Sequence, residues 1–238
     1  MQFLRSVLFT IVIYVMMLVL GLVFTPYAIA SKSGARTACK VYARWALVLA
    51  RVMVGLRTEI RGQVPIGEVV IAAKHQSFLD ILMIFDAVPQ AKFIMKRELL
   101  WTPIIGVYAK RLGCIPVNRG RKGAAIAKMV KDVSAEFEEP GQLVIYPQGT
   151  RVPPGEHLKY KVGTGVLYEG LAWPCVPSAT NVGLFWPKKG LLRKPGLGVV
   201  EFLEPMAPGQ ATGAFMKELE DKIEARSNAL MAEAGFHV

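Results

Sequence analysis

The sequence lacks the motifs on which several common catalytic classes depend. Its three cysteines, Cys39, Cys114 and Cys175, form neither a CxxC pair nor a Cys/His pattern, so they indicate neither a metal site nor a redox dithiol. The absence of GxSxG, Walker-type and GxGxxG segments argues against a serine hydrolase, a P-loop nucleotidase and a dinucleotide-binding domain. An odd, scattered set of cysteines suits a reducing compartment. We expect no metal and no cofactor.

Acidic residues are also scarce. The 238 residues include 29 Lys and Arg but 18 Asp and Glu, which gives a net charge of +11, and 53% of the chain is hydrophobic. A basic chain suits an anionic partner such as nucleic acid, acidic lipid or a phosphorylated substrate. The high apolar content favours a membrane partner over nucleic acid. The length suits one globular domain with an appendage.

Residues 7–24 carry no charge and would span about 27 Å as a helix, close to the hydrocarbon thickness of a bilayer. A signal peptide is the alternative, because Arg5 precedes this segment and Ala28-Ile29-Ala30 resembles a cleavage site. The length of the apolar segment favours a membrane anchor. Hydropathy leaves open whether it crosses the bilayer or forms half of a helical hairpin.

The next segment is amphipathic and basic. Lys40, Arg44 and Arg51 fall on one side of a helical wheel, which is typical of a helix at a membrane interface whose cations reach anionic head groups. Basic residues are concentrated after the apolar segment, and this asymmetry predicts that the body of the protein lies on the cytoplasmic side of the inner membrane. We therefore divide the chain into membrane-anchoring helices (1–57) and a catalytic-type α/β domain (58–238).

From residue 58 short apolar segments alternate with helical patterns, which predicts an α/β fold with a mostly parallel sheet flanked by helices. In such sheets chemistry is expected at the carboxyl ends of the strands. The predicted strands are 58–61, 69–73, 92–95, 114–117, 143–146, 175–180 and 199–203. The predicted helices are 78–86, 97–111, 121–138, 163–172 and one that begins near Thr212.

Lys74-His75-Gln76-Ser77-Phe78-Leu79-Asp80 follows the second of these strands. On a continuous helix the side chains of His75 and Asp80 would point about 140° apart, so a contact requires His75 to lie in the turn before the helix. Ser77 is a suitable N-cap for that helix. If the contact forms, Asp80 orients the imidazole as a general base. A structural histidine beside an unrelated aspartate is the alternative.

Two other strand ends carry cations. Arg119 and Arg121 precede a predicted helix that ends in glutamates, and this charge pattern opposes the helix dipole unless an anion is bound. Arg151 follows the turn Tyr146–Thr150. These arginines suggest a phosphate clamp at one edge of the sheet, with a solvated basic face as the alternative.

The order of these segments resembles the glycerolipid acyltransferase family, in particular bacterial 1-acyl-glycerol-3-phosphate acyltransferases. His75 and Asp80 match the HxxxxD motif. A GxxFIxR-type motif matches Gly113, Val117 and Arg119, with Pro116 in place of an aromatic residue. The remaining matches are Pro147, Gly149, Thr150 and Arg151 to FPEGTR, with Tyr146 for Phe and Gln148 for Glu, and Val176-Pro177 to a VPxx segment.

The resemblance implies acyl transfer from acyl-CoA or acyl-carrier protein to the sn-2 hydroxyl of lysophosphatidic acid in phospholipid synthesis. His75, oriented by Asp80, would act as the base, and Arg119 and Arg151 would hold the phosphate. Lys96 and Arg121 are further candidates for the phosphate, and Gln148, Gly149 and Thr150 are candidates for substrate positioning.

Gln148 is the main departure from the family pattern. Its amide keeps the reach of glutamate but carries no charge, so we expect it to hydrogen-bond the acceptor or to support the loop. The same departure leaves room for another acceptor, such as a lyso-ornithine lipid, or for a non-catalytic membrane-binding paralogue.

Overall fold

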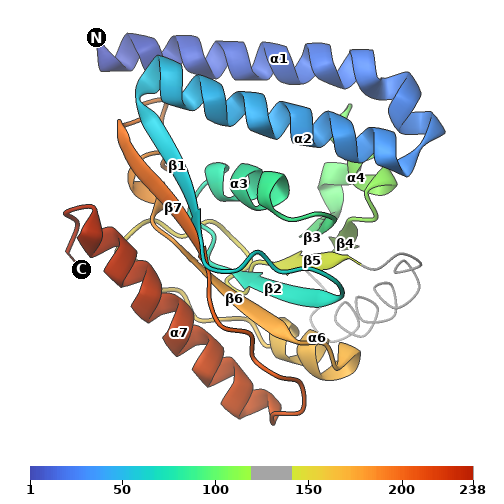
Figure 1. The fold of residues 1–238 in the computed structure, drawn as a ribbon, viewed down its shortest axis with the longest axis vertical. Helices are drawn as coiled ribbons and strands as arrows, with labels where there is room; N and C mark the ends of the chain where they lie inside the picture. Colours follow the sequence, from blue (N-terminus) through green and yellow to red (C-terminus); the bar gives the residue numbers. More distant parts are fainter. Residues whose placement is uncertain (119–140, 238) are drawn as a thin grey trace.

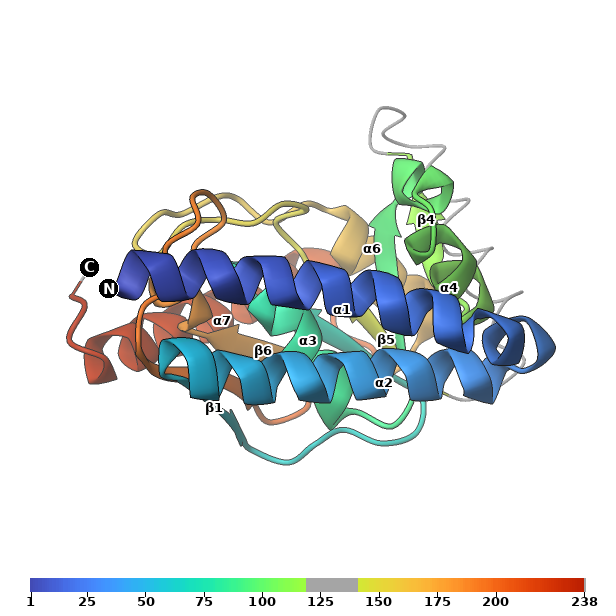
Figure 2. The ribbon, with the colours of Figure 1, turned by 90° about the horizontal axis from the view of Figure 1, so that it is seen from above.

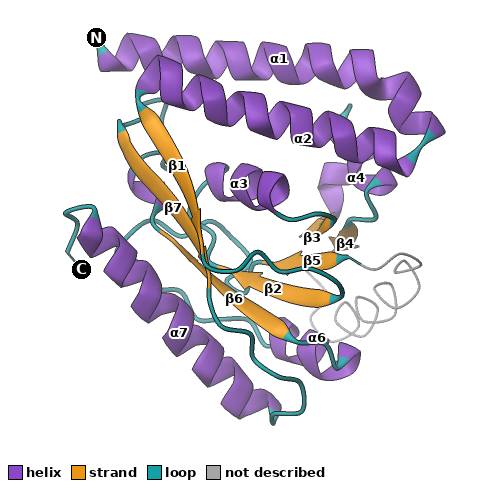
Figure 3. Cartoon of the chain, in the orientation of Figure 1, coloured by secondary structure: helices purple, strands orange, loops and turns teal. Residues whose placement is uncertain are grey.

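A seven-stranded sheet lies at the centre of the molecule, with helices on both faces (Figure 1, Figure 3). The computed structural model describes residues 1–118 and 141–237. The strand order is β1-β7-β6-β2-β5-β3-β4. The strands are β1 (Leu56–Arg61), β2 (Val69–Ala73), β3 (Ala91–Lys96), β4 (Ile115–Val117), β5 (Gln142–Ile145), β6 (Cys175–Thr180) and β7 (Gly196–Phe202).

The predicted fold class is confirmed. All neighbouring strands pair in parallel except β6 and β7, which are antiparallel. The predicted strands match the observed ones with shifts of up to three residues at their ends, where pairing with neighbours rather than local sequence sets the boundary.

The centre of the sheet is apolar on both faces because both faces are covered. In β2, Val69, Ile71 and Ala73 pack into a core with α3 (Leu79–Ala87). Val70 and Ala72 point to the other face and pack into a second core with α7 (Thr212–Glu233). This two-sided burial explains why β2 is a continuous apolar run rather than an alternating one. The helix α6 (Gly163–Leu171) lies beside α7 on the second face.

The predicted helix 97–111 is wrong as a continuous element. A 3₁₀ turn (Arg97–Trp101) is followed by a break, and α4 covers only Ile105–Arg111. Pro103 disfavours helical backbone at the residue before it, and Ile104 has a φ of 66°, outside the right-handed helical region. The predicted helix 121–138 lies outside the described residues.

The N-terminal segment forms two antiparallel helices, α1 (Gln2–Ala30) and α2 (Lys32–Leu49), followed by a π-helical turn (Ala50–Val54). They lie side by side over the α3 face of the sheet (Figure 1, Figure 2). Together, α1 and α2 form the helical hairpin, which was one of the two arrangements left open by hydropathy.

The helical hairpin is joined to the sheet domain along its length. Phe9 of α1 is fully buried and packs edge-to-face on Trp186, with ring centroids 5.3 Å apart. Near the other end of α1, the Tyr108 hydroxyl donates to the Gly21 carbonyl at 2.8 Å. The predicted boundary between residues 57 and 58 falls within β1, and residues on both sides of it contribute to one core.

The outer side of the helical hairpin is a continuous apolar face. Among the described helices, α1 alone is long and apolar enough to cross a membrane, by length and composition. The exposed apolar side chains include Phe3, Leu4, Leu8, Ile11, Val15, Leu18, Val19, Leu22 and Val23 of α1 and Trp45 and Val48 of α2.

The sequence suggested that the basic side chains of α2 face outward, but not all of them do. The Lys40 ammonium donates to the carbonyls of Asp86 and Val88 at 3.1 and 2.8 Å, at the C-terminal end of α3. Arg44 forms an ion pair with Asp86 at 3.3 Å. The prediction that Lys40 points to lipid head groups is therefore wrong, because the last carbonyls of α3 attract the cation.

We expect Phe9→Ala to lower the free energy of unfolding by about 3–5 kcal/mol, because it opens a cavity between α1 and the sheet domain. Phe3→Ala is the matched control, since Phe3 lies on the same helix but is exposed, and it should change stability by less than about 0.5 kcal/mol. Denaturant unfolding in detergent micelles measures both. Equal effects of the two variants would contradict the docking of α1.

Candidate active site

The carboxyl ends of parallel strands bring most of the predicted site residues to one edge of the sheet. β2 is followed by His75, its neighbour β5 by the turn that carries Arg151, and β3 ends at Lys96. The helix α3 then contributes Asp80 from its first turn. Arg119 and Arg121 lie outside the described residues.

His75 and Asp80 are in contact, as the sequence predicted. His75 Nδ1 lies 2.8 Å from Asp80 Oδ1. The other carboxylate oxygen accepts the backbone N–H groups of Gln76 and Ser77 at 2.9 and 2.8 Å. The turn thus folds back over the start of α3, and the aspartate holds both the imidazole and the backbone that carries it.

Ser77 also stabilises this turn, although one residue away from its predicted role. The helix α3 begins at Leu79, with Phe78 in the cap position. The Ser77 hydroxyl accepts the Leu79 N–H at 3.0 Å. It therefore satisfies one of the free donors at the helix start.

The surroundings of His75 set its tautomer. A carboxylate surrounded by donors accepts the proton of Nδ1, which leaves Nε2 as the basic nitrogen. The Asp80 side chain is completely buried, while 13% of the His75 side chain is exposed. The imidazole can thus meet a substrate proton, and its partner is shielded from water.

Tyr146, which stands where the family motif has Phe, restrains the imidazole further. The two rings stack with centroids 3.9 Å apart and planes at 19°. Burial, together with the negative charge of Asp80, raises the pKa of Tyr146 well above its usual value. Tyr146 therefore stays neutral and acts as a flat wall behind the base.

The turn after β5 is tied to the His75 loop. The Gly149 N–H closes a tight turn on the Tyr146 carbonyl at 2.8 Å, and Gly149 has a φ of 69°, which favours glycine. The Val152 N–H then donates to the His75 carbonyl at 2.8 Å. Arg151 is consequently held next to the base in space, although far from it in sequence.

Gln148 is buried rather than open to a ligand. Only 1% of it is exposed, and its amide NH₂ donates to the Leu158 carbonyl at 3.3 Å and to Glu224 at 3.4 Å. These contacts favour the second of its two expected roles, support of the loop. Thr150 accepts a hydrogen bond from the Lys188 ammonium at 3.3 Å.

The sequence did not reveal three residues beneath this loop: Lys74, Tyr160 and Glu224. The Lys74 ammonium lies 2.7 Å from both oxygens of Glu224, and the Tyr160 hydroxyl donates to the same carboxylate at 2.9 Å. A charged residue directly before His75 was the available signal for Lys74. The sequence held no such signal for Glu224, because charged residues are common along the exposed side of the amphipathic helix α7.

Lys96 lies at the carboxyl end of β3 but is paired locally. Its ammonium is 3.3 Å from Glu98, and both side chains are more than half exposed. In the register of β3 and β4, Lys96 stands opposite Val117, the last residue of the strand that leads to Arg119. Lys96 is therefore at the predicted edge, where an anion would compete with Glu98.

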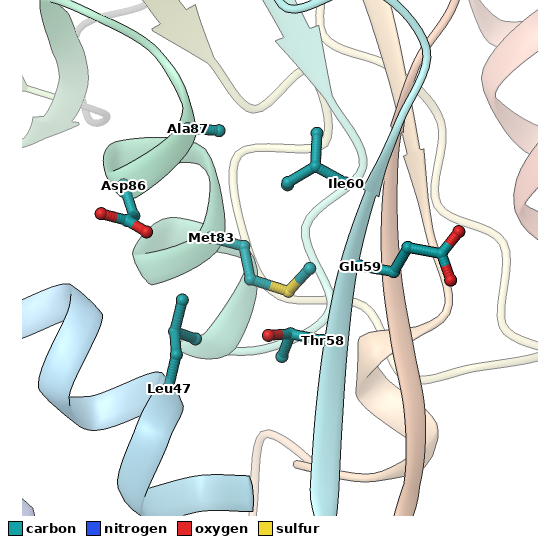
Figure 4. A pocket seen from close by; sticks show the side chains of 7 residues that line it. All are labelled: Leu47, Thr58, Glu59, Ile60, Met83, Asp86 and Ala87. Atoms are coloured by element: carbon teal, nitrogen blue, oxygen red, sulfur yellow. The ribbon is translucent and has the colours of Figure 1, made fainter.

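Two further observations concern possible ligand sites elsewhere in the described residues. No group of three His, Cys, Asp or Glu side chains suitable for a metal ion occurs in the part of the chain that the structure describes. A pocket between α2, α3 and β1 contains none of the predicted site residues and is lined by Leu47, Thr58, Glu59, Ile60, Met83, Asp86 and Ala87 (Figure 4).

Comparisons with known proteins agree with this arrangement. The chain is 32% identical to the 1-acyl-sn-glycerol-3-phosphate acyltransferase of Pseudomonas aeruginosa over 81% of its own length and 76% of that protein. It is 29% identical to the human 1-acyl-sn-glycerol-3-phosphate acyltransferase alpha, over 76% of this chain and 65% of that protein, just under two thirds.

The fold is also known. The crystal structure of the 1-acyl-sn-glycerophosphate acyltransferase PlsC from Thermotoga maritima superposes with a TM-score of 0.80 over 98% of both chains, at 19% identity. A family model described as Acyltransferase matches residues 56–181, the segment that contains His75, Asp80 and Arg151. With the His–Asp pair, the strand-end loops and these matches together, the chain belongs to the Acyltransferase family.

Proposed function

We propose that this protein transfers an acyl group from an acyl thioester to the sn-2 hydroxyl of 1-acyl-glycerol-3-phosphate, which yields phosphatidic acid. The observation that carries the proposal is the His75–Asp80 contact of 2.8 Å at the sheet edge that also bears Arg151. Family membership and the names of the relatives support the choice of acceptor.

In the proposed reaction, Nε2 of His75 removes the proton of the acceptor hydroxyl. The acceptor oxygen attacks the thioester carbonyl, the C–S bond breaks, and the departing thiolate takes the proton from His75. Asp80 stabilises the imidazolium formed in between. The acyl donor is acyl-CoA or acyl-carrier protein, and the step requires neither an acyl-enzyme nor a metal.

Arg151 is the described side chain best placed to hold the acceptor phosphate, because Val152 fixes its backbone against His75. Arg119, Arg121 and Lys96 complete the proposed clamp. A guanidinium binds phosphate through two parallel N–H groups, and correct placement of the acceptor supplies much of the rate.

The helical hairpin accounts for access to lipid substrates. Since α1 is attached to the sheet domain at both ends, we propose that its apolar face lies within one leaflet and does not cross the bilayer. The basic residues that follow α1 favour the cytoplasmic face of the inner membrane, because anionic head groups of that leaflet attract them.

We expect His75→Ala to lower kcat for acyl transfer to lysophosphatidate by about 10²–10⁴-fold, the usual contribution of a general base. Release of free thiol from acyl-CoA measures the rate. His157→Ala is the matched control, because His157 is exposed and pairs with Glu220 on α7. Equal activity of the two variants would contradict the assignment of His75 as the general base.

We expect Arg151→Ala to lower kcat/KM for lysophosphatidate by about 10–100-fold, the range for loss of a charge-assisted hydrogen bond. Transfer to 1-acylglycerol, which lacks the phosphate, should change much less. Arg57→Ala on the edge strand β1 is the control. A wild-type preference for 1-acylglycerol or for a lyso-ornithine lipid in the same acceptor panel would overturn the phosphate clamp.

We expect Val15→Glu and Leu18→Glu, on the exposed face of α1, each to weaken binding to anionic vesicles by about 10-fold or more, through loss of apolar burial. Ile66→Glu changes a still more exposed apolar residue outside the helical hairpin and should have little effect. Vesicle co-sedimentation measures all three, and indistinguishable binding would contradict the proposed membrane face.

A further inference from the structure

Beneath the catalytic edge lies a buried polar cluster formed by Lys74, Gln148, Tyr160 and Glu224, here called the loop-support cluster. Its members come from the His75 loop, from the segment after β5 and from α7. Lys74 and Gln148 are 3% and 1% exposed, and the Glu224 side chain is 17% exposed. A charged cluster that is mostly buried favours an internal balance of charge and of donors.

Glu224 is the acceptor at the centre of the loop-support cluster. Both of its oxygens lie 2.7 Å from the Lys74 ammonium. One of them also accepts the Tyr160 hydroxyl at 2.9 Å and the Gln148 amide at 3.4 Å. Lys74 and Glu224 cancel in charge, so the cluster as a whole is neutral.

The side chain at position 148 acts as a hydrogen-bond donor in this cluster. The Gln148 NH₂ faces two acceptors, the Leu158 carbonyl and Glu224. A carboxylate there would face the same two acceptors and would leave the cluster with one uncompensated negative charge. The amide at this position is therefore matched to the carboxylate that α7 supplies.

The cluster also fixes the turn that carries Arg151. Gln148 is held from below by Glu224 and Leu158, and four residues after it the Val152 N–H donates to the His75 carbonyl at 2.8 Å. Lys74, bonded to the same Glu224, directly precedes His75. The base and the arginine thus depend on one shared support.

We propose that Glu224, with Lys74 and Gln148, is a positioning residue that sets the placement of Arg151 relative to His75. This inference rests on the proposed function, because the placement matters through binding of the acceptor phosphate.

A charge exchange tests the proposal. Gln148→Glu leaves a net negative charge in the cluster, Glu224→Gln leaves a net positive charge, and the double variant restores neutrality. The control is Glu220→Gln, one turn earlier on α7, where Glu220 pairs with an exposed histidine. For each full-length variant, kcat and KM are measured with lysophosphatidate and with 1-acylglycerol, and the melting temperature is measured in detergent.

We expect each single variant to lower kcat/KM for lysophosphatidate by about 10-fold or more, to raise KM and to reduce the preference for lysophosphatidate over 1-acylglycerol. The double variant should return to within about 3-fold of the wild type in all three quantities and in melting temperature. Glu220→Gln should match the wild type.

Three outcomes would overturn the proposal: a Gln148→Glu variant as active as the wild type, a double variant no better than the worse single variant, or equal losses with both acceptors. If a single variant does not fold, recovery of folding and of acceptor preference in the double variant supports it. If the wild type transfers no acyl group, the proposed function fails. The positioning role is then tested by the affinity of the same proteins for lysophosphatidate, which should fall in each single variant and recover in the double variant.

Discussion

The site depends on a single carboxylate. One oxygen of Asp80 accepts a hydrogen bond from the His75 imidazole. The other accepts hydrogen bonds from two backbone N–H groups of the preceding turn. Asp80 therefore fixes the tautomer of the base and the path of the chain that presents it. Complete burial of Asp80 removes competing water, which makes these hydrogen bonds stronger than they would be at the surface.

The second constraint is the parallel sheet. Because β2, β5 and β3 run in the same direction, the loops that follow them meet at one edge, and direct hydrogen bonds then lock the loops together. Under this edge, the Lys74–Glu224 pair connects α7 to the same loops. The site is thus supported from both faces of the sheet, which suits a reaction that depends on placement of its acceptor.

The helical hairpin packs against α3, the helix that carries Asp80. Phe9 and Ile13 of α1 share a core with Leu79, the neighbour of Asp80 on α3. Lys40 of α2 binds the other end of α3 through backbone carbonyls. A membrane surface that holds the helical hairpin would therefore hold the catalytic edge at a fixed height, with α3 as the rigid connection between them.

The sequence by itself determined the α/β class and most strand positions, because hydrophobic periodicity is local. It showed that a His75–Asp80 contact was possible, and the structure decided that the contact forms. The sequence failed at Ile104, where a positive φ breaks the predicted helix, and at Lys40, whose partners at the end of α3 are distant in sequence. Only the tertiary structure shows what Gln148 contacts. Its partner Glu224 lies 76 residues away, and the charge of a buried cluster is a property of all the residues that packing brings together.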